Sequence, residues 1–220
     1  MKKLIILLAI PLLIYGAYKL VYPTYNWNQK LTLVVDTPDG VKTGSSVVNI
    51  WVRYRPQILP DASGVFNGMR GEATVVDLGG GRTLFALLQG SGAMTERVFG
   101  ANDPDLWYES GSTRKRKATP VPPDALPMLV TFDDVTDPKS VRLVDPADLA
   151  ASFGAGYALR EVTLEITRER VTTGVVEGVL GWWKPENKPV KLEGPMWDWK
   201  HPDFDISQAL RIRDFIKGEK

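Results

Sequence analysis

Apolar positions form one nearly continuous run at the start of the chain. Apolar side chains fill Leu4–Tyr22 except at Lys19, and two lysines precede the run. A helix needs roughly 20 such residues to cross a bilayer core, and a helix is the form in which one segment satisfies its own backbone there. The pattern predicts a membrane anchor at residues 1–23, with residues 4–22 in contact with the lipid bilayer.

The alternative for this stretch is a secretory signal that is removed. Leu4–Tyr15 has the length of the apolar region of such a signal. Cleavage requires small residues one and three positions before the cut, but a cut after Ala17 places Tyr15 at the third position. The tyrosines near the end of the run are also typical of an aromatic belt at a membrane surface. An uncleaved anchor is therefore favoured.

The charges around the run predict its orientation. Lys2 and Lys3 favour a cytoplasmic N-terminus, although Lys19 and Lys30 weaken the asymmetry. In a Gram-negative host, residues 24–220 would then lie in the periplasm, and the absence of cysteine agrees with an oxidising compartment. We expect a single-pass protein of the cell inner membrane with a periplasmic C-terminal domain.

Alternation of apolar and polar residues dominates the rest of the chain and predicts strands. Expected strands are Lys30–Asp36, Ser45–Tyr54, Gly71–Leu78, Arg82–Gln89, Met128–Phe132 and Leu159–Thr167. Residues 37–44 would join the first two strands in a hairpin, and Gly79, Gly80 and Gly81 would form the turn of a second hairpin.

Helical signals are sparse. Residues 144–154 (VDPADLAASFG) predict a short helix, with Asp145 as N-cap and Gly154 at the stop. Residues 207–217 fit either a helix or a strand, and residues 90–127 show little periodicity and predict a long loop. The fold expected is mainly β: a β-sandwich or an open barrel with one or two short helices.

Composition narrows the classes of function. Lys plus Arg is 27 and Asp plus Glu is 26, which argues against a nucleic-acid partner. The chain contains no cysteine, which excludes a Cys nucleophile and a lipid-modified N-terminal Cys. Neither the charge balance nor the lack of cysteine predicts a cofactor.

Sequence motifs in Leu126–Trp183 suggest a relationship. The pieces DPKSV, VDPADLAASFG, VTLEIT and VTTG followed by an aromatic pair resemble a family of uncharacterised, membrane-anchored envelope proteins of proteobacteria. Gly181 departs from the Pro-Trp ending typical of that family. The resemblance implies an envelope location, and it carries over no catalytic residue.

The sequence gives only weak signals for catalytic or metal-binding residues. His201 is the single histidine, near Asp198, Asp203 and Asp205, and it fits neither an EF-hand loop nor a usual zinc site. Ser91 lies in GSG, which is not the nucleophile elbow of hydrolases. Several aspartates could hold calcium but also suit turns and caps. These are Asp133, Asp134, Asp137, Asp145 and Asp148.

Two clusters are candidates for binding. Tryptophans gather around the C-terminal segment 184–220, where they could form a binding hot spot or a sugar platform, or close the core. They are Trp182, Trp183, Trp197 and Trp199. A basic run could meet anionic lipid heads or form a solvated loop. It consists of Arg114, Lys115, Arg116 and Lys117.

Together these patterns predict a non-enzymatic binding or assembly module of the bacterial envelope with an envelope protein as partner. Two alternatives remain open. One is an envelope hydrolase or metal-dependent enzyme that uses His201 and the nearby aspartates. The other is a module that contacts lipid or glycan through the basic run and the tryptophans.

Overall fold

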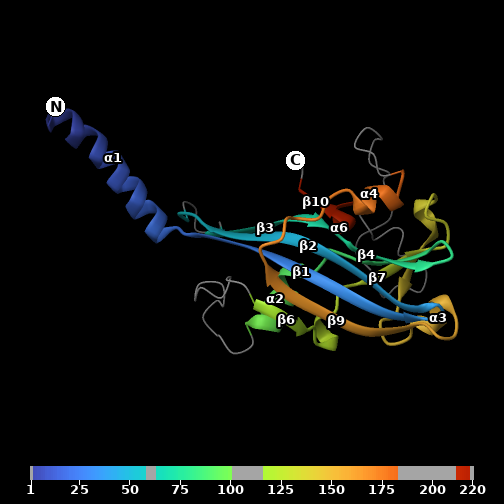
Figure 1. The fold of residues 1–220 in the computed structure, drawn as a ribbon. Helices are drawn as coiled ribbons and strands as arrows, with labels where there is room; N and C mark the ends of the chain where they lie inside the picture. Colours follow the sequence, from blue (N-terminus) through green and yellow to red (C-terminus); the bar gives the residue numbers. More distant parts are fainter. Residues whose placement is uncertain (1, 58–62, 101–115, 183–211, 219–220) are drawn as a thin grey trace.

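The computed structural model describes residues 2–57, 63–100, 116–182 and 212–218 (Figure 1). The chain begins with helix α1 (Lys2–Val21), whose side chains are described from Ala9 onward, and α1 projects as a single rod away from the β-rich domain. Among the residues whose side chains are described, which in α1 begin at Ala9, no helix combines the length and the apolar character that crossing a membrane requires.

Two antiparallel sheets make up the domain, which confirms the mainly β fold. The six-stranded sheet has the order β10-β3-β2-β1-β9-β6 and the four-stranded sheet has the order β4-β5-β7-β8. The strands of the larger sheet are β1 (Thr24–Thr37), β2 (Gly40–Tyr54), β3 (Val65–Glu72), β6 (Arg116–Pro120), β9 (Ala158–Thr167) and β10 (Ile216–Lys217). Those of the smaller sheet are β4 (Thr74–Gly79), β5 (Arg82–Ala86), β7 (Leu129–Phe132) and β8 (Val141–Val144).

Much of the hydrophobic core lies in two layers on either side of the smaller sheet, and a third cluster forms around Trp27 of the larger sheet. Between the sheets, Leu33 of β1 packs in one cluster with Leu84 of β5 and Leu164 of β9. On the far face of the smaller sheet, Phe85 and Val130 belong to a second cluster, which helix α4 (Val175–Val179) and helix α6 (Ile212–Phe215) help to form. The arrangement is sandwich-like, with short helices on the outer face of one sheet.

The β1–β2 hairpin is tighter than the sequence predicts. Thr37 pairs with Gly40, so the connection is Pro38 and Asp39, and the expected connection over residues 37–44 is wrong. Residues 41–44 continue β2 instead, and Gly44 is needed there because a Cβ would lie 2.1 Å from the carbonyl oxygen of Val75 on β4. Gly44 thus lies where β2 comes close to the backbone of β4.

Short helices are more numerous than the one or two expected. Within 90–127, the described residues form helix α2 (Ser91–Phe99), the 3₁₀ turn η1 (Pro123–Ala125) and strand β6, so the prediction of a loop is wrong for them, and residues 101–115 lie outside the description. The expected helix is α3 (Leu149–Phe153). Its N-cap is Asp148, which accepts the Ala151 N–H, rather than Asp145, which accepts an N–H in the preceding turn.

Candidate functional site

Trp182 is the one predicted binding tryptophan that lies within the described residues. Its indole N–H donates to the carbonyl of Val135 at 2.8 Å, and its ring meets Phe132 edge-on with 6.2 Å between centroids. Its ring packs against the outer core cluster, so this side chain closes the core, as one of the two interpretations predicted. Trp183, Trp197 and Trp199 lie outside the described residues, and their binding role stays a prediction.

The basic run at residues 114–117 also lies only partly within the described residues. Arg114 and Lys115 lie outside the described residues, whereas Arg116 and Lys117 open the edge strand β6. The Arg116 guanidinium lies 5.8 Å from the ring centre of Phe99 on α2, and Lys117 is exposed. These two residues therefore belong to a sheet edge rather than to a solvated loop.

Four of the five aspartates in 133–148 serve turns and caps. The Asp134 carboxylate accepts hydrogen bonds from the hydroxyl and the backbone N–H of Thr136. These bonds hold the pKa of Asp134 below its ordinary value, and the bond from the hydroxyl has the larger effect. Asp133 pairs with Arg142 at 2.7 Å. Across the described part of the chain, no group of acidic, histidine or cysteine side chains could hold a metal ion. His201 and its acidic neighbours lie outside that part.

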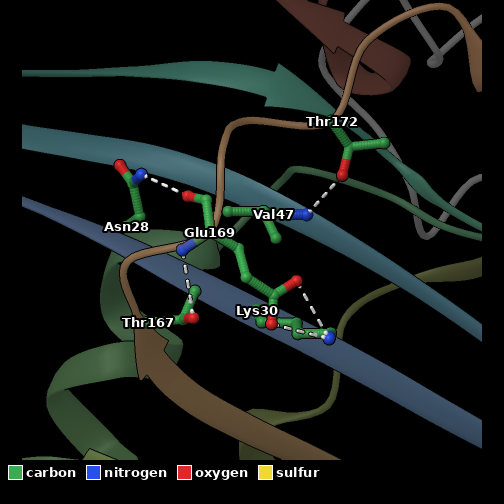
Figure 2. A network of polar contacts seen from close by, with 6 residues as sticks. All are labelled: Asn28, Lys30, Val47, Thr167, Glu169 and Thr172. Carbon is green, nitrogen blue, oxygen red and sulfur yellow. Dashed lines mark hydrogen bonds and ion pairs between the residues drawn. The ribbon is translucent and has the colours of Figure 1, made fainter. Parts of the chain in front are cut away.

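A polar network fastens the segment that leaves β9 across the outer face of the larger sheet (Figure 2). The Asn28 side-chain amide donates to the carbonyl of Glu169 at 2.8 Å, and the Lys30 ammonium contacts the Glu169 carboxylate at 3.0 Å. Further along, the Thr172 N–H donates to the carbonyl of Val47, whose own N–H donates to the Thr172 hydroxyl at 2.8 Å. The network satisfies backbone groups of β2 and is structural.

The same segment leads into a second anchoring point at α4. Glu72, at the end of β3, is only 1% exposed. Its carboxylate accepts the N–H of Val175 at 3.2 Å and that of Val176 at 2.9 Å. A buried carboxylate is stabilised by such bonds to backbone N–H groups, so Glu72 ties α4 to the larger sheet.

A different type of surface lies where α1 meets the domain. Only Tyr22 and Pro23 separate α1 from β1, and the Pro23 carbonyl accepts the N–H of Tyr54 near the end of β2 at 3.1 Å. An open cleft of about 470 Å³ lies beside this short connection. The lining residues are Tyr18, Lys19, Tyr22, Thr24, Arg53, Tyr54 and Arg55.

We call this cleft between α1 and the domain the junction cleft. The register of the larger sheet brings its two arginines close to the end of α1. Thr24, the first residue of β1, pairs with Arg53, and Arg55 lies two residues further along the chain. Each guanidinium lies over an aromatic ring: Arg53 over Trp51 at 5.3 Å and Arg55 over Phe66 at 5.0 Å. The sequence gives no signal for this set, because only the strand pairing shows that Arg53 returns to the end of α1.

Comparison of the chain with protein-family models, with curated proteins and with solved structures finds no match. The resemblance of Leu126–Trp183 to membrane-anchored envelope proteins stays a prediction.

Proposed function

We propose that this protein is a single-pass, inner-membrane-anchored module of the bacterial envelope whose β-rich domain lies in the periplasm and acts by binding. The observation that supports the anchor is the exposure of apolar side chains all round α1. Leu12 and Leu13 are each 72% exposed and Leu20 is 84% exposed. Apolar surface of this extent is uncommon on soluble proteins and marks contact with a membrane or a partner.

The end of α1 favours a membrane over a protein partner. Tyr15 and Tyr18 lie on its last two turns and Tyr22 follows the helix directly, and the Lys19 ammonium lies 5.8 Å from the ring centre of Tyr15. Tyrosine and lysine at the end of an apolar helix are typical of the interface between lipid and water. The periplasmic side follows from Lys2 and Lys3, which favour a cytoplasmic N-terminus.

Alkaline carbonate extraction of membranes tests the anchor. The wild-type chain should stay in the membrane pellet, whereas Leu12→Arg with Leu13→Arg should release it, because arginine in the middle of a membrane helix costs about 3 kcal/mol. The matched control is Leu143→Arg, which changes a 55%-exposed leucine on the domain and should leave the chain in the pellet. A wild-type chain that carbonate releases would overturn the proposal.

Binding rather than catalysis is favoured because many of the described acidic side chains hold caps, turns and ion pairs. We propose an envelope protein as partner, bound through Trp197 and Trp199. Crosslinking in cells should capture a partner with the wild-type chain and lose it when both tryptophans become alanine. Capture of the same partner by both proteins would contradict this assignment. A phenotype lost on His201→Ala would favour the hydrolase or metal-enzyme alternative instead.

A further inference from the structure

Within the described part of the chain, the junction cleft concentrates positive charge without an acidic residue in its lining. Lys19, Arg53 and Arg55 are the three charged residues of its lining, and none of the lining residues is acidic. The ion pairs among the described residues join other cations to carboxylates, and none of them involves these three. All three side chains are exposed. Among the described residues these three cations have no acidic partner, and beside tyrosine side chains they are suited to bind an anion.

Geometry restricts the type of anion. Each guanidinium lies over an aromatic ring, and neither is engaged in an ion pair among the described residues, so its N–H groups can donate to a ligand. Arginine forks of this kind suit the oxygens of a phosphate, to which they can donate two parallel hydrogen bonds. The cleft of about 470 Å³ is large enough for a phosphate with a small organic substituent.

Position identifies the source of the phosphate. α1 has 20 residues and is about 30 Å long, the thickness of the hydrocarbon core. With α1 in the bilayer, as the proposed function has it, the cleft at its end lies at the depth of the headgroups. We propose that the junction cleft binds the phosphate of an anionic phospholipid headgroup through Lys19, Arg53 and Arg55. The bound lipid would fix the domain against the membrane surface.

Lipid binding to the full chain, purified in a neutral detergent, tests the inference by native mass spectrometry. Phosphatidylglycerol should bind at least tenfold more tightly than phosphatidylcholine. Replacing both Arg53 and Arg55 with glutamine should weaken phosphatidylglycerol about fivefold for each charge removed. The matched control changes Arg168 and Arg170 to glutamine, because this exposed pair has the same spacing and is not part of the lining of the cleft.

Lys19→Gln keeps the test independent of folding, because Lys19 lies on α1 outside both sheets, and about a fivefold loss is expected. Equal affinity for the two lipids, or an equal loss in the control pair, would overturn the inference. Displacement of the lipid by a comparable concentration of glycerol 3-phosphate would also overturn it, because the site would then take a soluble phosphate. A chain that carbonate retains in membranes but that shows no lipid preference refutes this inference alone, whereas release by carbonate refutes the anchor.

Discussion

Removal of the Glu72 carboxylate should destabilise the domain through a single buried backbone group. In Glu72→Ala the N–H groups of Val175 and Val176 lose their acceptor. Val175 is 45% exposed, so water can replace the carboxylate there, whereas Val176 is completely buried. A buried N–H without a partner costs about 1–3 kcal/mol, and the lost hydrogen bond to a charged group adds a similar amount.

We therefore expect Glu72→Ala to lower the free energy of unfolding by about 3 kcal/mol. For a chain of this size that corresponds to a fall in melting temperature of roughly 6–12 °C. Glu72→Gln keeps one oxygen as an acceptor but loses the charge, so about 1 kcal/mol is expected. Thermal unfolding of the full chain in detergent, followed by circular dichroism, measures both values.

Glu161→Ala is the matched control, because Glu161 is an exposed glutamate on β9 whose loss should change stability by less than about 0.5 kcal/mol. The reasoning is refuted if Glu72→Ala melts within about 1 °C of the wild type. It is also refuted if Glu161→Ala melts as early as Glu72→Ala, since the loss would then not depend on the buried bonds.

Three further predictions concern packing and pH. Gly44→Ala should cost about 3 kcal/mol in chemical denaturation, because its Cβ would meet the Val75 carbonyl oxygen at 2.1 Å. Trp182→Phe should cost about 1 kcal/mol by losing the indole hydrogen bond, whereas Trp182→Ala should cost about 3 kcal/mol. The pKa of Asp134 is lowered by its bonds to Thr136, so the stability that its carboxylate contributes is present above its ordinary pKa of about 4 and is lost as pH falls through the lowered value. NMR titration of Thr136→Val should show that pKa rising toward the ordinary value.

Gly178→Ala is the control for the glycine substitution. A Cβ on Gly178 meets nothing within 4 Å, and the residue lies inside α4, so alanine should be neutral or slightly stabilising. Equal losses for Gly44→Ala and Gly178→Ala would contradict a close approach between β2 and β4. An Asp134 pKa that does not move in Thr136→Val would contradict the assigned cause.

Strands in the middle of the sheets could be predicted from the sequence. Val162, Leu164 and Ile166 of β9 are buried as expected, because one face of that strand meets the core and the other is polar, which produces a period of two. The hairpin with Gly79, Gly80 and Gly81 is also confirmed, with positive φ at each glycine.

The elements at the edges of the fold could not be predicted, because only two or three residues of each are buried and these leave no periodic pattern of apolar residues. In β8 only the end residues, Val141 and Val144, are buried, and β3 buries only its last two residues, so neither strand alternates. Helix α2 buries Ser91, Met94 and Thr95, of which two are polar and give no apolar stripe.

Local sequence pattern singles out only one side of the junction cleft. Tyr18, Lys19 and Tyr22 are close together in the chain, where they predict an aromatic belt with a basic residue, and that belt stays a prediction. Arg53 and Arg55 arrive through the pairing of β2 with β1, a long-range contact that no local pattern encodes.

Proteolysis of spheroplasts tests the central claim most directly. The full chain, with a C-terminal tag, is expressed in a Gram-negative host and exposed to proteinase K. The account predicts that the tag is protected in intact cells and lost from spheroplasts, while a cytoplasmic marker survives in both. A tag that stays protected in spheroplasts until detergent is added, or a chain released with the periplasmic fraction, would contradict it.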